Sequence, residues 1–98
     1  MQFIIIAHDG PGMLDQRMAV RARHLENLGT IRGKVLCAGG LLDDAGRMMG
    51  SALVLDVESR ADLDAYLADE PYILEGVWER VEVTPMNVVL LDGGKIGK

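Results

Sequence analysis

The sequence lacks the features that mark disulfide-stabilised, metal-cluster and membrane-spanning proteins. Its 98 residues include a single cysteine, Cys37, which cannot close an internal disulfide or supply a multi-cysteine zinc or iron–sulfur site. No apolar run approaches the roughly 18 residues that span a bilayer, and the run at residues 3–7 is too short for a signal-peptide core. We therefore expect a protein of the reducing cytoplasm with no membrane partner.

Basic residues are also scarce. Ten Lys and Arg stand against fifteen Asp and Glu, so the formal net charge is −5 at pH 7. A chain of this charge is repelled by nucleic acid and by anionic lipid, and neither is an expected partner. A hydrophobic fraction of 49% with 26% charged residues is typical of a folded domain, and the length leaves room for one. We expect a single domain over residues 1–92 and a flexible tail over 93–98.

Hydrophobic periodicity and turn residues predict the order β-α-β-β-α-β. Strands are expected at residues 2–8, 34–38, 51–57 and 77–83, helices at 13–28 and 60–68, and a further β-like run at 86–91. Ser59 precedes the second helix and Asp62 follows three residues later, which is the pattern of a capping box. The order predicts an α+β, ferredoxin-like fold with two helices on one face of a four-stranded antiparallel sheet.

Two of the expected strands are apolar on both faces, at residues 3–6 and 52–55. A sheet with one wet face should alternate apolar and polar residues, so the second face needs a cover. A chain this short has no spare layer. A second copy, packed sheet against sheet with the last run exchanged or paired across the interface, supplies the cover most economically. We therefore predict a homodimer.

The first predicted helix carries polar residues on its apolar side. A helical wheel groups four apolar residues on one arc: Leu14, Met18, Leu25 and Leu28. Arg17, Arg21 and His24 lie inside the same arc. Either the arginines extend to the edge and His24 is a hydrogen-bonded core or interface residue, or His24 titrates near neutral pH in a site where the arginines attract an anionic substrate.

A second group of candidates follows the second helix, in the run Asp69-Glu70-Pro71-Tyr72. The two carboxylates either mark a solvated helix end, or one of them reaches the imidazole of His24. A carboxylate in contact with the ring would fix its tautomer and stabilise its protonated form, as acid/base work requires.

For other candidate site residues the sequence gives weaker support. His8 ends the first strand, and it either lines the same pocket or lies at the surface. Tyr72 and Trp78 either stack on a flat ligand ring or pack in the core. Asp43-Asp44 is a turn signal without the spacing of a calcium loop, so no metal site is expected. Cys37 lies in an apolar run and is expected in the core.

Three motifs taken together resemble the YCII-related family. They are the Arg-x-x-His at residues 21–24, the glycine-bounded hairpin at 38–51, and the acid-Pro-aromatic turn at 69–72 with the Glu-Gly-Val-Trp run that follows it. The resemblance covers about residues 2–86. It implies a ferredoxin-like domain that pairs into a dimeric α/β barrel, as in muconolactone isomerases and small monooxygenases. It also implies a His/Asp site in which His24 takes the histidine role. The family usually has Asp before the proline, whereas this chain has Glu70 there and Asp69 one residue earlier, so either can be the partner.

The resemblance extends to a class that removes chloride from chlorinated hydroxyquinol or hydroxyquinone intermediates of aromatic degradation. The expected function is a cofactor-independent acid/base enzyme that eliminates chloride from a quinone-like small molecule. His24 would be the acid/base, Glu70 or Asp69 its orienting carboxylate, and Arg17 or Arg21 the group that stabilises negative charge. The alternatives are a non-catalytic ligand-binding module, a muconolactone-isomerase-like activity, and a monooxygenase with haem on His24.

Overall fold

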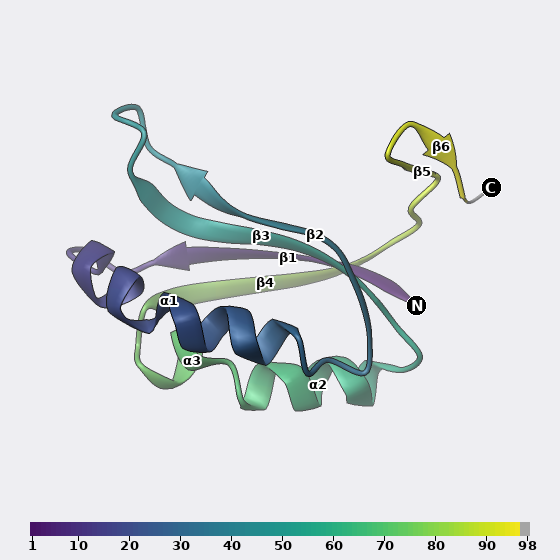
Figure 1. The fold of residues 1–98 in the computed structure, drawn as a ribbon, viewed down its shortest axis with the longest axis horizontal. Coiled ribbons are helices and arrows are strands. Elements are labelled where there is room, and N and C mark those ends of the chain that lie inside the picture. The colour runs from purple at the N-terminus through teal and green to yellow at the C-terminus, as the bar shows by residue number, and fades with distance from the viewer. Residues whose placement is uncertain (97–98) are drawn as a thin grey trace.

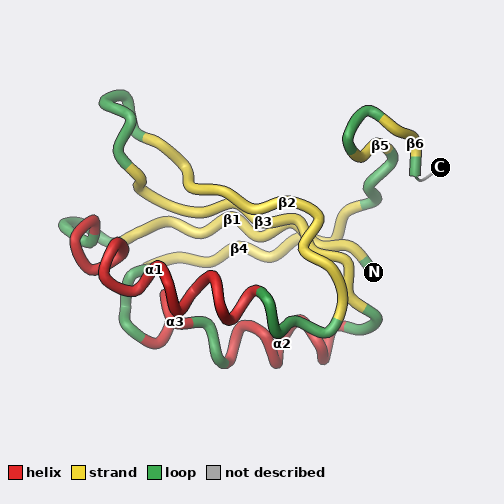
Figure 2. Tube along the Cα trace, viewed as in Figure 1, coloured by secondary structure: helices red, strands yellow, loops and turns green. Residues whose placement is uncertain are grey.

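The main sheet has the strand order β2-β3-β1-β4, and all neighbouring strands are antiparallel (Figure 1). The computed structural model describes residues 1–96. Its strands are β1 (Gln2–Asp9), β2 (Gly33–Leu42), β3 (Met48–Val57) and β4 (Trp78–Met86). The helices are α1 (Leu14–Leu28), α2 (Arg60–Ala68) and the short α3 (Pro71–Leu74), and all lie on one face of the sheet (Figure 2). The predicted ferredoxin-like α+β fold is confirmed, with α3 as an addition.

Alternation along the strands places the core between the sheet and the helices. Phe3, Ile5 and Ala7 of β1 are buried, while Ile4 and Ile6 on the opposite face are only partly covered. In the register of the sheet, Ile5 lies opposite both Leu53 of β3 and Val83 of β4. The helix-facing residues of three strands therefore meet, and each fully buried Leu, Ile or Phe contributes roughly 1.5–3 kcal/mol.

Helix α2 begins and ends where the sequence predicts. The hydroxyl of Ser59 accepts a hydrogen bond from the backbone N–H of Asp62 at 3.3 Å, as the capping pattern requires. Leu63 and Tyr66 face the core. Pro71 then starts α3, because a proline at the first helical position loses no hydrogen bond there.

Helix α1 is rotated relative to the predicted arc. Its buried residues are Arg17, Val20, His24 and Leu28. The prediction was wrong for Met18 and Leu25, which are 52% and 47% exposed, and Arg21 is exposed as well. Arg17 and His24 both bind buried acidic partners, and these two contacts set the rotation of the helix. Met18 and Leu25 can remain at the surface at a smaller cost in free energy.

Strand β2 is an edge strand and is largely exposed. Its register with β3 shifts between Val35 and Cys37, and Cys37 is exposed, so its predicted place in the core was wrong. The turn between β2 and β3 is held by the Asp43 carboxylate, which accepts the backbone N–H groups of Arg47 and Ala45, each at 2.9 Å. The Arg47 hydrogen bond is the main cause that lowers the pKa of Asp43.

After β4 the chain leaves the main sheet and ends in a small hairpin, which extends away from the body (Figure 1). In this C-terminal hairpin β5 (Leu90–Leu91) pairs with β6 (Gly94–Lys95). Asp92 and Gly93 connect them, and both have positive φ, as a two-residue hairpin turn requires. The β-like run predicted at 86–91 is thus not one strand: Met86 ends β4, residues 87–89 are not in a strand, and only Leu90–Leu91 form β5. The predicted tail begins inside the hairpin, and residues 97–98 lie outside the described residues.

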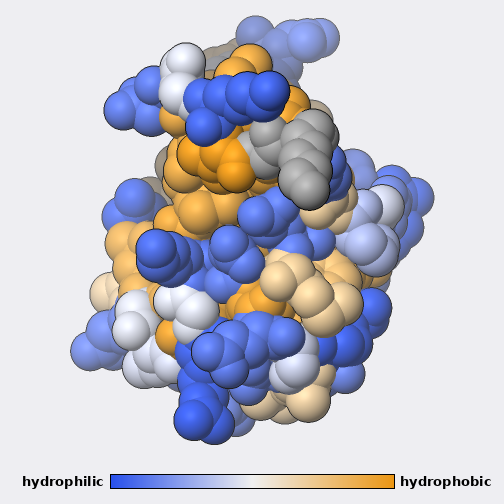
Figure 3. Space-filling model, turned by 90° about the vertical axis from the view of Figure 1, so that its right-hand side faces the viewer, coloured by the Kyte–Doolittle hydropathy of each residue, from blue (hydrophilic) through white to orange (hydrophobic). Residues whose placement is uncertain are grey.

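The sheet does not close into a barrel within the described chain, because β2 and β4 are its edges. Its outer face carries Ile4, Ile6 and Val54, all partly exposed. Apolar side chains also gather around the C-terminal hairpin (Figure 3), where Leu90 and Ile96 are exposed. Among residues 1–96, no helix has the length and apolar content needed to cross a membrane. The homodimer stays a prediction, and the outer face is the surface we propose for it.

We predict that Val54→Glu will convert a dimer into a folded monomer. The side chain points to the outer face, so a charge there opposes sheet-to-sheet packing without entering the core. Ala22→Glu adds the same charge on the exposed side of α1 and should leave the dimer intact. Sedimentation velocity at micromolar concentration tests both variants, and a wild-type protein that sediments as a monomer would contradict the prediction.

Candidate active site

A cleft of about 100 Å³ opens between helix α1 and the β2 edge of the sheet. Helices contribute Arg17, Arg21, His24 and Tyr72 to its walls, among others. Strands β2 and β3 contribute Ala38, Gly39, Gly40, Met48, Ser51 and Leu53. A Cβ added at Gly39 would meet nothing within 4 Å, and one at Gly40 would lie 3.2 Å from the side chain of Met48. Gly39 therefore leaves open space at the cleft, whereas at Gly40 the side chain of Met48 already occupies the space that a Cβ would face.

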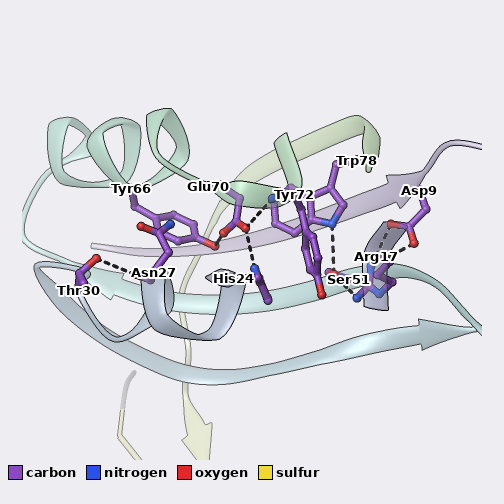
Figure 4. Close-up of polar contacts among 10 residues, drawn as sticks. All are labelled: Asp9, Arg17, His24, Asn27, Thr30, Ser51, Tyr66, Glu70, Tyr72 and Trp78. Carbon is purple, nitrogen blue, oxygen red and sulfur yellow. Dashed lines mark hydrogen bonds and ion pairs between the residues drawn. The ribbon is translucent and has the colours of Figure 1, made fainter. Parts of the chain in front are cut away.

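His24 and Glu70 form a buried pair at the cleft (Figure 4). Nδ1 of His24 lies 2.7 Å from Oε1 of Glu70, whose exposed fraction is 0%. The same oxygen accepts the backbone N–H of Tyr72 at 3.1 Å, and Oε2 accepts the hydroxyl of Tyr66. Burial, and after it the charge of Glu70, raises the pKa of Tyr66, so this hydroxyl stays a donor. Three donors thus surround a carboxylate that is costly to bury alone.

The identity of the acid beside His24 follows from the local chain geometry. Glu70 is the N-cap of α3, and its side chain turns inward to accept the N–H of Tyr72. Asp69 is the C-cap of α2 and is exposed. The structure therefore brings Glu70, and not Asp69, to the imidazole.

The second ring nitrogen of His24 is left for the cleft. Within residues 1–96, Nε2 makes no hydrogen bond, and it is not among the buried polar atoms that lack a partner. The acceptor Glu70 favours the tautomer that carries its proton on Nδ1. Nε2 is then the atom that can take a proton from a bound molecule and return it.

A second buried ion pair involves Arg17. Its Nη1 donates to both carboxylate oxygens of Asp9, at 2.9 and 3.1 Å, and its Nη2 donates to the Ser51 hydroxyl at 2.7 Å. Trp78 Nε1 donates to the same hydroxyl at 3.3 Å. The charge of Arg17 is thus neutralised inside the protein.

Arg21, by contrast, lines the cleft, is exposed, and belongs to no ion pair of the described residues.

The aromatic side chains pack against the site rather than offering a free ring face. The ring of Tyr72 stands between His24 and Arg17 (Figure 4). Trp78 is buried, meets the His24 ring edge-on with centroids 5.8 Å apart, and is not part of the cleft wall. Neither ring is placed to stack on a ligand.

His8 lies on the opposite face of the sheet. It follows Ile4 and Ile6 in the alternation of β1, and its Nε2 is 3.8 Å from a carboxylate oxygen of Glu82. The structure does not bring it to the cleft. Among the described residues, no three His, Cys, Asp or Glu side chains gather as a metal site would require.

Two polar residues of the site were not identified from the sequence: Tyr66, which binds Glu70, and Ser51, which binds Arg17. Tyr66 precedes Glu70 by four residues, a spacing at which side chains meet on a helix, and this was the available signal although α2 ends at Ala68, before Glu70. Ser51 is the polar residue that shares the helix-facing side of β3 with Leu53 and Leu55. A polar group in such a position needs a partner, and that requirement could have singled it out.

The chain matches a known protein family and several of its members. The YCII-related domain matches residues 1–87. The protein YciI of Escherichia coli is 32% identical over 97 residues, which cover 91% of this chain and 99% of that protein. An uncharacterised protein of Haemophilus influenzae is 33% identical over 98 residues, again covering 91% of this chain and 99% of the relative.

Among solved structures, the chain is similar to 5-chloro-2-hydroxyhydroquinone dehydrochlorinase from Burkholderia phenoliruptrix in complex with 2,5-dihydroxybenzoquinone. The TM-score is 0.78 at 27% identity, with 88% of this chain and 93% of that chain covered. An antibiotic biosynthesis monooxygenase is also similar, with a TM-score of 0.59 at 16% identity over 91% of this chain and 98% of that one. The second likeness shows the fold alone.

We predict that Tyr66→Phe will lower the free energy of unfolding by about 1–3 kcal/mol, the usual cost of depriving a buried acceptor of its donor. Tyr72→Phe is the matched control, because its hydroxyl bonds to no protein group within residues 1–96, and it should change stability by under about 0.5 kcal/mol. Urea unfolding measures both. Equal stability of the two variants would show that the Tyr66 hydroxyl does not support Glu70.

Proposed function

Because the chain belongs to the YCII-related family and holds a buried histidine–carboxylate pair at a cleft, we propose that it is a small lyase that works by acid/base catalysis without a cofactor. Its substrate is a hydroxylated, quinone-like ring. The reaction we favour is elimination of chloride, by likeness to the Burkholderia dehydrochlorinase. The observation that carries the proposal is the contact of His24 Nδ1 with Glu70, which leaves Nε2 for the cleft.

The proposed roles follow from the contacts of each side chain. His24 Nε2 moves the proton, and Glu70 keeps the ring in one orientation and stabilises its positive charge when it is protonated. Arg21, at the cleft and without a carboxylate partner in the described chain, attracts the anionic form of the substrate. Arg17 keeps the wall of the cleft in place through Asp9 and Ser51.

The elimination balances without an oxidant when 5-chloro-2-hydroxyhydroquinone is the substrate. One hydroxyl proton moves to the ring carbon that bears chlorine, and a second hydroxyl proton is lost. Chloride then leaves with the electron pair of the carbon–chlorine bond, and the ring remains as a hydroxybenzoquinone. Each proton transfer can use the same imidazole, first as base and then as acid.

Chloride release from 5-chloro-2-hydroxyhydroquinone tests the proposal directly. We predict that His24→Ala will lower the turnover number by roughly 10²–10⁴-fold, the usual contribution of a positioned acid/base, with the fold retained. Glu70→Gln should reproduce much of this loss. Asp69→Asn is its matched control and should match wild type, because Asp69 is exposed and makes no hydrogen bond or ion pair with His24 or Glu70.

Two outcomes would reject the proposal. Wild-type turnover by His24→Ala would remove the histidine from the chemistry. Binding of 2,5-dihydroxybenzoquinone with no chloride released by the wild-type protein would instead favour the ligand-binding module.

A further inference from the structure

The ring and the hydroxyl of Tyr72 are in different situations at the cleft. One ring face stacks on His24, with centroids 4.1 Å apart and planes inclined by 20°. Cζ of Arg17 lies 4.7 Å from the ring centroid, and Figure 4 shows the ring standing between these two side chains. Both faces are therefore covered, and a ligand in the cleft has no face of Tyr72 to stack on.

The hydroxyl of Tyr72 has no hydrogen-bond partner among the described residues. Within residues 1–96 it donates to no protein group, although the residue as a whole is only 1% exposed. It is also not among the buried polar atoms without a partner, which in the described chain are Arg17 Nε and Asn27 Nδ2. A hydroxyl that is neither paired nor fully buried reaches solvent, and Tyr72 meets the cleft. The small exposed part of this residue thus includes its hydrogen-bond donor.

Charges of both signs lie around this donor. Burial raises the pKa of Tyr72, so the hydroxyl keeps its proton at neutral pH; the charges of Arg17 and Arg21 act in the opposite direction, and those of Glu70 and Asp9 add to the rise. The charge of Arg17 is compensated by Asp9, whereas Arg21 lies exposed at the cleft. A hydrogen bond to an ionised oxygen is stronger than one between neutral groups.

We propose that the Tyr72 hydroxyl donates a hydrogen bond to the substrate oxygen that becomes negative when His24 Nε2 removes its proton. The inference rests on the proposed function and adds an oxyanion donor to it. The imidazole and the phenol are stacked on each other, so one small ring substituted with oxygens can reach both.

The test uses Tyr72→Phe, which keeps the stacked ring and removes only the donor. The probe is 2,5-dihydroxybenzoquinone, and its affinity is measured by calorimetry beside the melting temperature. We expect about tenfold weaker binding at an unchanged melting temperature, the effect of one lost hydrogen bond to a charged or strongly polar oxygen. Unchanged affinity would overturn the inference. A variant that fails to fold would overturn it too, because the hydroxyl would then have a partner inside the protein.

His8→Ala is the matched control, since His8 lies on the other face of the sheet, and it should bind the quinone as wild type does. A tenfold loss there as well would overturn the inference by showing that the assay does not report on the cleft. The two proposals fail separately. If wild type binds the quinone but releases no chloride, the lyase function fails, while weaker binding by Tyr72→Phe still supports the donor. If wild type does not bind the quinone at all, both are overturned.

Discussion

The complete burial of one carboxylate is the constraint on which the rest of the site depends. Glu70 has no exposed surface, so it needs donors from the protein. Those donors come from three elements: the hydroxyl of Tyr66 on α2, the imidazole of His24 on α1, and the backbone of Tyr72 in α3. Satisfying one side chain therefore fixes the relative positions of all three helices. It also fixes which nitrogen of His24 is left for the cleft.

The pair of Asp9 and Arg17 repeats this arrangement at the other end of the cleft. Arg17 and His24 are seven residues apart on α1, two turns of the same face, and each binds a buried acid. The ring of Tyr72 fills the space between them. The wall of the cleft is thus a packed row of guanidinium, phenol and imidazole, in which the guanidinium and the imidazole are each held by a buried acid.

The sequence predicts those elements whose position depends on local capping and apolar spacing. It does not predict those whose position depends on polar contacts with distant residues. Helix α2 could be placed to the residue because Ser59 caps it and apolar spacing defines its face. The wheel placed Arg17 and His24 on the inner arc of α1, but it also placed Met18, Arg21 and Leu25 there, and these three are exposed. The exact rotation depends on the distant partners of Arg17 and His24, which the sequence of the helix does not contain. Residues 69–72 predicted an acid near His24, but the choice of Glu70 depends on the turn into α3, a three-dimensional feature.

The physical cost of these pairs bears on why the chain keeps them. Well-packed apolar residues of similar volume often stabilise a core as well as a buried ion pair or better, since removing two charges from water is expensive. A purely structural helix contact would be served by leucine or methionine at 17 and 24. Two buried acids, each paired with a basic residue of the same cleft wall, are therefore hard to explain by stability alone. The pair of Glu70 and His24 agrees with the acid/base role proposed for His24, in which the imidazole gains and loses a proton without changing its orientation.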